Sequence, residues 1–425
     1  MSKPMKLLPE LRFPEFEGNV WEQKKLGELG CFLGGGTPSK SNPEFWVGEL
    51  PWISSSDLNE DDIHSISITR YINSNALKET ATKLIPIASV IFVSRVGVGK
   101  LAINKREVCT SQDFTSFIPE SIGSYFIGYY FSSNKNLLQS MNQGTSIKGF
   151  SKSDLENFML PYPTNPLEQQ KIASCLSSLD ELLAAHKDKL DALRIHKKGL
   201  MQNLFPHPSA SSGTGRNVPQ LRFAEFEEDG EWERVVLDKI SHKIMVGIAS
   251  AATHAYRKSG IILFRNQNIK EGYLDDRDIL YIDEEYEKAH KNKRLKGGDL
   301  LTARTGYPGT TCMVPAKYEG SQSFTTLITR PNNKFIDSSF LCFYLNSETG
   351  QAFFNSTKIG GGQKNVNAGS LSEMPIPHPS QKEQQKIASC LSALDELITA
   401  QTEKIEELQA HKKGLMQGLF PKIEG

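Results

Sequence analysis

The sequence has no excess of charge of either sign, because 49 lysines and arginines are balanced by 49 aspartates and glutamates. No global field therefore draws the protein onto nucleic acid or a membrane, and any polyanion site must be a local patch. Long apolar runs are missing too. The longest, LIPIASVIFV, is far shorter than a membrane span, and the start MSKPMKLLPELRF lacks the apolar core of a signal peptide. We expect a soluble, cytoplasmic protein.

Signatures of catalysis and metal binding are absent as well. The nine histidines show no HExxH or similar spacing. GVGK from Gly97 lacks the leading glycine of a phosphate loop, and NPEF from Asn42 lacks the second proline of the methyltransferase NPPF motif. The six cysteines form no CxxC pair, so we expect buried free thiols. The sequence predicts neither a catalytic centre nor a metal site.

What the sequence does contain is a long internal repeat. The segment EQQKIASCLSSLDELLAAHKDKLDALRIHKKGLMQNLFP from Glu168 returns as EQQKIASCLSALDELITAQTEKIEELQAHKKGLMQGLFP from Glu383. The copies agree at roughly two thirds of their positions without a gap, which indicates a tandem duplication. Matching headers, PELRFPEF from Pro9 and PQLRFAEF from Pro219, extend the duplication to whole units.

Apolar residues recur in each tail at alternating spacings of four and three, which is the seam of a coiled coil. The apolar seam positions are Ile172, Leu176, Leu179, Leu183, Leu190, Leu193 and Leu200 in the first tail, and Ile387, Leu391, Leu394, Ile398, Ile405, Leu408 and Leu415 in the second. Two equal seams in one chain predict that the helices pair with each other. The alternative is that each helix packs only on its own globular body.

Polar residues interrupt both seams at matching places, namely His186 and Gln401, and Lys197 and Lys412. They either fix the register of the pair or face solvent. Gly199 and Gly414 mark either fraying or the close approach of another protein.

Each tail also carries a helix start signal. The segments 165–168 and 380–383 have the polar N-cap and the glutamate of a capping box. About 40 residues follow, enough for a helix of about 60 Å. Such helices would act as spacers.

The bodies between header and tail match only in fragments, such as SQDFTSFI from Ser111 against SQSFTTLI from Ser321. Strand-like runs such as VIFVSR from Val90 and helical stretches such as SYFIGYYFSSNKNLLQ from Ser124 predict mixed α and β structure. Segments 135–152 and 349–372 carry cations, amides and hydroxyls but no acidic residue. Such groups position phosphates and contact base edges, although an ordinary solvated loop is the alternative for any one segment.

A header ending in LRFPEF, a variable body, a QQKIA…LDEL…HKKGLMQ tail and a second copy of all three closely resemble the specificity subunit of type I restriction-modification systems, over essentially the whole chain. The resemblance implies an α+β fold with two mixed α/β target recognition domains in tandem, separated by an antiparallel coiled coil. The implied recognition domains are 1–163 and 218–378, the spacer helices are 164–206 and 379–421, and 207–217 is a flexible linker.

The resemblance also implies a function. Each recognition domain would recognise one half of a bipartite double-stranded DNA target, while the coiled coil sets the spacer and docks two modification (methyltransferase) subunits. Restriction (endonuclease and translocase) subunits complete the complex. S-adenosylmethionine, ATP and magnesium would be used by those partners, and this chain itself would bind no cofactor and catalyse no reaction.

Candidate DNA contacts lie in polar loops of both bodies. In the first body they are Thr37, Ser39, Lys40, Ser54, Ser55, Ser56, Arg95, Lys100, Thr145, Lys148 and Lys152; in the second they are Arg265, Asn266, Gln267, Asn268, Arg304, Tyr307, Lys364, Asn365 and Asn367. Arginine suits guanine and asparagine suits adenine, and each good bidentate pair discriminates by roughly 1–3 kcal/mol.

A competing hypothesis is a non-enzymatic scaffold whose coiled coil joins two protein-binding modules. Two unlike bodies on one repeated frame fit a divided DNA site better, because the duplex backbone is two-fold symmetric while its sequence is not.

Overall fold

The two halves of the chain form two units in the computed structural model, which describes residues 8–141, 149–206, 217–250, 252–356 and 366–421. Unit 1 comprises residues 1–187 and 403–425, and unit 2 comprises residues 188–402. Two long helices, α5 (Pro166–Asn203) and α10 (Gln381–Leu419), each begin in one unit and end in the other. Each unit thus contains one body and part of both helices.

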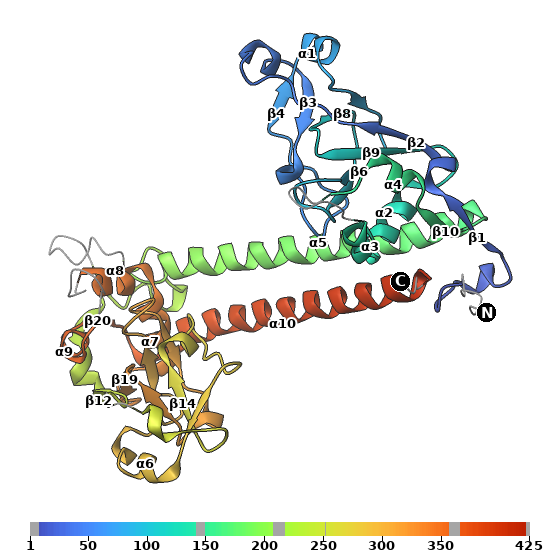
Figure 1. The fold of residues 1–425 in the computed structure, drawn as a ribbon. Coiled ribbons are helices and arrows are strands. Elements are labelled where there is room, and N and C mark those ends of the chain that lie inside the picture. Colours follow the sequence, from blue (N-terminus) through green and yellow to red (C-terminus); the bar gives the residue numbers. More distant parts are fainter. Residues whose placement is uncertain (1–7, 142–148, 207–216, 251, 357–365, 422–425) are drawn as a thin grey trace. The chain divides into compact units, whose positions relative to one another are not determined.

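Unit 1 has two four-stranded sheets and a two-stranded ribbon among its described residues (Figure 1). Its strands are β1 (Trp21–Lys25), β2 (Gly30–Gly34), β3 (Leu50–Ile53), β4 (Arg70–Ile72), β5 (Leu84–Ile85), β6 (Val90–Val93), β7 (Leu101–Ile103), β8 (Val108–Thr110), β9 (Phe114–Pro119) and β10 (Met159–Pro163). Its shorter helices are α1 (Ser74–Glu79), α2 (Ser124–Ser133), α3 (Lys135–Ser140) and α4 (Lys152–Glu156).

Unit 2 repeats this plan. Its strands are β11 (Glu233–Val236), β12 (Ser241–Val246), β13 (Tyr256–Arg257), β14 (Ile261–Arg265), β15 (Leu280–Ile282), β16 (Leu300–Thr302), β17 (Thr311–Met313), β18 (Gln322–Phe324), β19 (Leu327–Pro331) and β20 (Pro375–His378). Its shorter helices are α6 (Glu284–Lys288), α7 (Ser338–Asn346), α8 (Glu348–Ser356) and α9 (Ala368–Ser372).

Strand order shows how closely the bodies correspond. The order β2-β9-β6-β7 in unit 1 equals β12-β19-β16-β17 in unit 2, and the parallel pair β3–β8 equals β14–β18. The second sheet differs at its edge, since β5 extends it beyond β8 in unit 1 whereas β13 extends it beyond β15 in unit 2. The predicted α+β class with two mixed bodies in tandem is confirmed.

The cores follow from the sequence pattern. Strand β6 is buried along its whole length, and α2 buries every residue from Phe126 to Phe131, so both read as continuous apolar runs. The helical stretch from Ser124 is interrupted, because Asn134 ends α2 and its side-chain amide donates to the Tyr130 carbonyl at 2.9 Å. The single helix expected there is therefore two.

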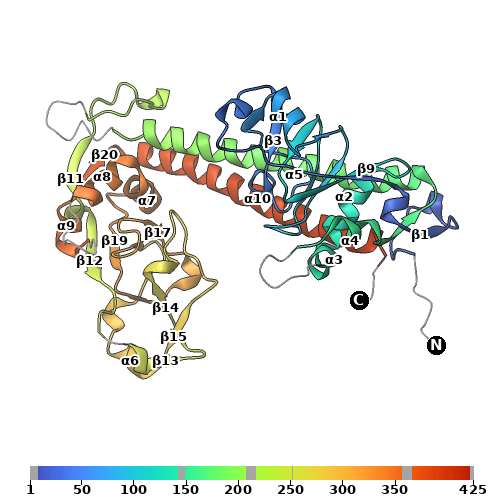
Figure 2. The ribbon, with the colours of Figure 1, turned by 45° about the horizontal axis from the view of Figure 1, so that its top comes forward.

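A part of each long helix belongs to each unit (Figures 1 and 2), and both helices contribute to its core. In unit 1 the core contains Ile172 and Leu176 from the start of α5 together with Leu419 and Phe420 from the end of the second tail. In unit 2 it contains the end of α5 together with the start of α10. Since the start of one helix lies with the end of the other, the two run antiparallel within each unit.

All fourteen apolar seam positions are buried or half-buried. The first turns of each helix also pack on the adjoining body, so the alternative arrangement coexists with pairing. Gly199 and Gly414 lie inside continuous helices, with open space beside them where a Cβ atom would be. The glycines therefore do not break the helices.

Burial of the cysteines is only partly as expected. All six are free, and Cys109, Cys312 and Cys342 are buried, but Cys31 on strand β2 is exposed. Burial raises the pKa of the Cys342 thiol to about 12. No helix in the described part of the chain is long and apolar enough to cross a membrane.

Candidate nucleic-acid interface

In unit 1 a polar turn follows strand β3. Asp57 closes this turn by accepting hydrogen bonds from the Ser54 backbone N–H at 2.7 Å and from the Ser54 hydroxyl at 3.2 Å. Arg70 on strand β4 donates to Ser54 Oγ at 2.7 Å and also to the Asp57 carboxylate. Ser55 is half-buried and Ser56 is exposed. The turn therefore presents hydroxyl groups from a braced backbone.

Unit 2 has a turn of the same kind after strand β14. Asn268 closes it, because its Oδ1 accepts from the Arg265 N–H at 2.9 Å while its Nδ2 donates to the carbonyls of Asp275 and Asp278 at 3.0 and 2.8 Å. Only 2% of Asn268 is exposed. Its amide is used by the fold, so Asn268 is not available to a base edge.

The other side chains of this turn are shared between the fold and the surface. Arg265 Nη2 and Gln267 Nε2 both donate to Asp278 Oδ2, at 3.0 and 2.7 Å, and the Asp278 side chain is 74% exposed. Asn266 is held from both ends, since its Oδ1 accepts from the Arg304 N–H at 2.8 Å and its Nδ2 donates to Thr325 Oγ1 at 3.2 Å. The turn and the start of the next hairpin are thereby joined.

A β-hairpin lies beside each turn. In unit 1 it joins β6 to β7, and Lys100 near its tip donates to the Leu58 carbonyl at 3.2 Å, just past the serine turn. Arg95 and Val96 at this tip are exposed. In unit 2 the hairpin joins β16 to β17, and Arg304 at its start donates through Nε to the Val366 carbonyl at 3.2 Å.

The glycine loop of unit 1 presents Thr37, Ser39 and Lys40 as exposed residues. Its glycines have a packing role: a Cβ on Gly35 would lie 1.9 Å from the Ser111 carbonyl oxygen, and one on Gly36 would lie 2.5 Å from the Thr82 nitrogen. The loop passes too close to its neighbours for any other residue, so its glycines do not by themselves indicate a phosphate site.

The remaining candidates are scattered. Lys152 is exposed and pairs with Glu156 at 3.3 Å within α4, and Asn367 caps α9 by accepting from the Ser370 N–H at 2.8 Å. Asn367 therefore serves the fold, as does Lys100 through its bond to the Leu58 carbonyl. Four more fall outside the described residues, namely Thr145, Lys148, Lys364 and Asn365.

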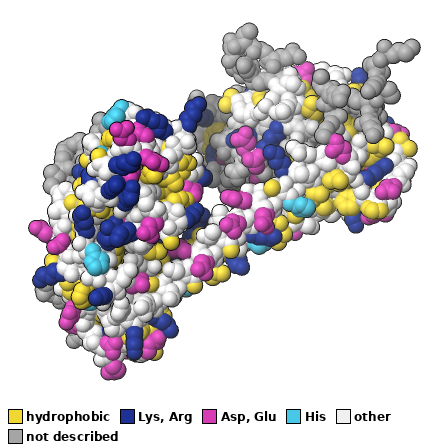
Figure 3. Space-filling view, turned by 90° about the horizontal axis from the view of Figure 1, so that it is seen from below, with side chains coloured by type: hydrophobic (Ala, Val, Ile, Leu, Met, Phe, Trp, Pro, Cys, Tyr) yellow, Lys and Arg dark blue, Asp and Glu magenta, His cyan; other side chains and the backbone are white. Residues whose placement is uncertain are grey.

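Cations gather on unit 2 outside these turns. Lys288, Lys291, Arg294 and Lys296 are all exposed around α6 and the turn after it. Figure 3 shows lysine and arginine side chains grouped on the face of this unit seen there, interspersed with acidic ones. A chain of zero net charge thus carries a local group of cations, with the exposed Glu284 and Glu285 beside it.

Sequence reasoning missed a pair of buried ion pairs that connect header and tail. Glu168 does not close a capping box; its carboxylate accepts from Arg12 at 2.8 and 2.9 Å and from Trp21 Nε1 at 3.0 Å. Glu383 likewise accepts from Arg222 at 2.8 Å through both oxygens. Both glutamates are 1% exposed. The signal was in the sequence, because this arginine and this glutamate are identical in both copies.

The seam lysines form a second connection. Lys412 bonds Asp180 at 2.5 Å in unit 1, and Lys197 bonds Asp395 at 2.6 Å in unit 2. Asp180 also accepts from Tyr129 Oη at 2.7 Å and lies 3.2 Å from His64 Nε2. The lysines thus pair with the opposite helix and do not simply face solvent.

Asp180 has a shifted pKa. Burial raises the pKa of this carboxyl, but the hydrogen bonds from His64, Lys412 and Tyr129 outweigh burial, so its pKa lies below the ordinary value. Asp180 is therefore a charged acceptor near neutral pH.

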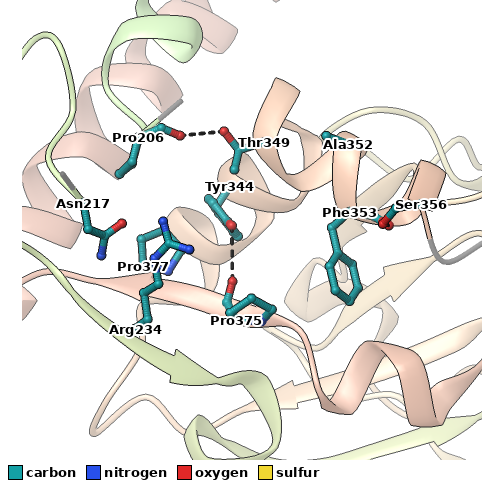
Figure 4. A pocket seen from close by; sticks show the side chains of 10 residues that line it. All are labelled: Pro206, Asn217, Arg234, Tyr344, Thr349, Ala352, Phe353, Ser356, Pro375 and Pro377. Carbon is teal, nitrogen blue, oxygen red and sulfur yellow. Dashed lines mark hydrogen bonds between the residues drawn. The ribbon is translucent and has the colours of Figure 1, made fainter. Parts of the chain in front are cut away.

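A pocket of about 310 Å³ lies in unit 2 away from the polar turns (Figure 4). Arg234, Tyr344 and Phe353 are among its lining residues, and none of the candidate DNA contacts lines it. Among the described residues no cluster of His, Cys, Asp or Glu side chains is arranged to hold a metal ion.

The two bodies share one fold, and each has a polar turn held by hydrogen bonds and a hairpin beside it. Together they define a class of protein that presents two different polar surfaces on a repeated fold. The family model for the type I restriction modification DNA specificity domain matches residues 19–194 and 230–410. The chain belongs to this family and carries two copies of its domain in tandem. Membership supports a DNA-specificity role over the scaffold hypothesis.

Relatives agree with this membership. The chain is 24% identical to the type I restriction enzyme MjaVIII specificity subunit of Methanocaldococcus jannaschii, over 98% of this chain and 96% of that protein. It is 33% identical to the MjaIX specificity subunit of the same organism, over 44% of each chain. In fold it is similar to the S subunit of a type I restriction-modification system from M. genitalium, with a TM-score of 0.61 at 14% identity over 98% of this chain and all of that one.

Proposed function

We propose that this chain confers DNA sequence specificity on a type I restriction-modification complex, with each body recognising one half of a bipartite duplex target. One observation carries the proposal. The turns after β3 and β14 are closed in the same way, by a bond from the first backbone N–H to a side-chain oxygen three residues on, yet one offers Ser54, Ser55 and Ser56 and the other offers Arg265 and Gln267. Equivalent places with different hydrogen-bonding groups suit two different half-sites.

The chemistry of each turn matches base edges. Serine hydroxyls donate or accept, while an arginine fork fits the two major-groove acceptors of guanine. Arg265 is held by Asp278 in the free protein, and that carboxylate is largely exposed. A guanine edge can take the place of this exposed carboxylate as an acceptor, while Arg265 Nη2 keeps its bond to the Asp278 carbonyl at 2.9 Å.

Repeated features on the helices support two copies of one protein partner. Leu182 and Leu397 occupy equivalent positions in the tails and are 42% and 53% exposed. Gly199 and Gly414, also equivalent, leave open space beside each helix. We assign these places to two modification subunits, with restriction subunits joining the complex and with S-adenosylmethionine, ATP and magnesium used by those partners. The paired helices would set the spacing between half-sites.

The test uses the chain assembled with its modification subunits. Methylome sequencing of a strain expressing the complex should show a motif of two specified halves around an unspecified spacer. Specific binding should also weaken steeply with salt, since each neutralised phosphate adds about 0.9 to the logarithmic slope. A salt-independent binding constant, or no methylated motif, would rule the proposal out in favour of a protein scaffold.

A variant pair makes the test residue-specific. Arg265→Ala should relax one position in one half-site, at a cost of roughly 1–3 kcal/mol. Arg277→Ala is the matched control, because Arg277 is in the same unit, its side chain is 81% exposed and it pairs with Asp275. It should leave the motif unchanged.

A further inference from the structure

The tip of the β16–β17 hairpin presents an aromatic ring that the fold does not use. Tyr307 is 85% exposed, the highest exposure among the large apolar side chains of the described residues. The turn around it is closed, since its carbonyl accepts from the Thr310 N–H at 3.2 Å and the Gly309 N–H donates to the Ala303 carbonyl at 2.9 Å. Gly306 and Gly309 supply the positive φ angles that this turn needs, 76° and 99°.

The hairpin is fixed to the body behind it. A Cβ on Gly309 would lie 2.7 Å from the Phe354 ring, and Gln351 Nε2 donates to the Gly309 carbonyl at 3.0 Å. At its other side the Arg304 N–H donates to Asn266 Oδ1. Packing and hydrogen bonds therefore hold the tip beside the polar turn after β14, with the Tyr307 ring directed away from the core.

The surroundings of the ring suit a polyanion. The hairpin from Leu300 to Met313 contains Arg304 and no acidic residue. An exposed aromatic ring on a hairpin that carries an arginine and no carboxylate has the two elements of base stacking, which are a flat apolar face and attraction to phosphates.

We propose that Tyr307 is a stacking residue, whose ring packs against a base that is unstacked from its neighbour in the half-site recognised by unit 2. The inference rests on the proposed DNA-recognition function and adds that this half-site is sensed partly through stacking, in addition to hydrogen bonds at base edges. Asn266 becomes a positioning residue, because its amide is spent on the hairpin and on Thr325.

Unit 1 makes no equivalent contact. Its hairpin has Gly97 where unit 2 has Tyr307, since the Lys100 N–H donates to the Gly97 carbonyl as the Thr310 N–H does to Tyr307. The exposed side chains there are those of Arg95 and Val96, the latter at 66%, and neither has an aromatic ring. An aromatic stack from this hairpin is therefore confined to one half-site.

The experiment uses the complex with modification subunits and duplexes that carry 2-aminopurine at successive positions of both half-sites in the methylated motif. Tyr307→Ala should weaken specific binding about 5- to 100-fold, as expected for one lost base–aromatic stack. Tyr307→Phe should bind as the wild type does, because the ring remains. A fluorescence change at one position of the unit 2 half-site should appear with the wild type and Tyr307→Phe and vanish with Tyr307→Ala. Val96→Ala is the control and should change neither affinity nor fluorescence.

Three results would contradict the stacking role or the proposed function. If Tyr307→Ala binds the motif as tightly as the wild type with the fluorescence change intact, the inference is wrong while the proposed function stands. If Tyr307→Ala sheds modification subunits in light scattering but the assembled fraction binds DNA normally, the tip docks a protein and the inference is wrong. If the wild type shows no specific binding, the proposed function itself fails.

Discussion

Units 1 and 2 share the buried ion pair between header and tail, and they differ in the polar residues that follow their strands. Arg12 and Glu168 in unit 1 have their equals in Arg222 and Glu383, with nearly identical distances. At the turns after β3 and β14, by contrast, different residues form the ion pair: in unit 1 the closing residue Asp57 is paired with Arg70, whereas in unit 2 the first residue, Arg265, is paired with Asp278. The comparison teaches that the contacts that hold a unit together were retained after duplication, and the groups at the strand ends were not.

The lysine–aspartate ion pairs between the two long helices also differ, although less. Lys412 and Lys197 each bond an aspartate of the opposite helix, and each lies over an aromatic ring, Tyr129 in unit 1 and Phe343 in unit 2. The hydroxyl of Tyr129 extends the unit 1 cluster to Asp180 and to His64, which phenylalanine does not allow. The same connection is thus more polar and more extensive in unit 1.

The largest expected effect comes from shortening both helices. Deletion of residues 187–193 and 402–408 removes one heptad from each, or about 10 Å, while keeping the seam in phase. Against DNA rising about 3.4 Å per base pair, this equals about three base pairs and nearly a third of a turn. Methylome sequencing should show a shorter spacer or no methylation. Unchanged methylation at the original spacing would mean that the helices do not set the distance.

The next largest effect concerns the two buried arginine–glutamate ion pairs. It tests whether each pair stabilises its own unit by the same amount. Arg12→Ala and Arg222→Ala each leave a buried glutamate without its cation, a change that costs about 3–5 kcal/mol. Trp21 Nε1 still bonds Glu168, whereas Trp232 Nε1 has no partner in the described part of the chain, so the loss should be greater in unit 2. Hydrogen exchange by mass spectrometry, which separates the units, should show each loss in its own unit.

The prediction on the buried ion pairs has matched controls. Glu15→Ala and Glu225→Ala remove ion pairs with Lys171 and Lys386 whose side chains are about half exposed. They should cost no more than about 1 kcal/mol. Equal losses for buried and exposed pairs would contradict a structural role for the buried ones.

The smallest effect distinguishes the two lysine–aspartate ion pairs on the helix seams. Asp180→Asn should destabilise unit 1 by about 1–3 kcal/mol because it disturbs a buried hydrogen-bonded network. Asp395→Asn should cost unit 2 less than about 1 kcal/mol, because the Asp395 side chain is 40% exposed. Chemical denaturation monitored by hydrogen exchange would measure both losses of stability. A larger loss for Asp395→Asn than for Asp180→Asn would show that the cluster around Asp180 adds nothing.

A pH series sharpens this pair. The pKa of Asp180 is lowered in the folded state, so its stabilising contribution is present above the unfolded value of about 4 and is lost as pH falls through the lowered folded value. The stability difference between the wild type and Asp180→Asn should therefore narrow in acid below about pH 4. A difference that widens there would contradict the role given to the charged carboxylate.

The sequence predicted the fold well where it repeats. Two copies of one tail disclosed the duplication, and the alternation of four and three predicted which faces of α5 and α10 are buried. It was less informative for the turns, because a polar residue after a strand can either serve the fold or face a ligand. Asn268 and Asn367 were expected to contact DNA, and their side chains instead accept hydrogen bonds from backbone N–H groups of the fold.

Matching letters in the bodies were also misleading. SQDFTSFI and SQSFTTLI align Phe117 with Leu327, but Phe117 lies opposite Val90 and Thr329 lies opposite Leu300, at equivalent places two residues beyond the positive-φ residues Ala88 and Gly298. The true correspondence is therefore Phe117 with Thr329. A loop of different length before β9 and β19 shifts the register, and sequence alone does not show this.

Exchange of one body tests the central claim most directly. A hybrid in which residues 218–374 are replaced by the equivalent segment of a relative with a different motif keeps the unit 1 body and changes only the unit 2 body. Methylome sequencing of a strain that carries the hybrid with its modification subunits should show one half-site altered and the other unchanged. A motif altered in both halves, or in neither, would contradict two bodies that each recognise their own half of the target.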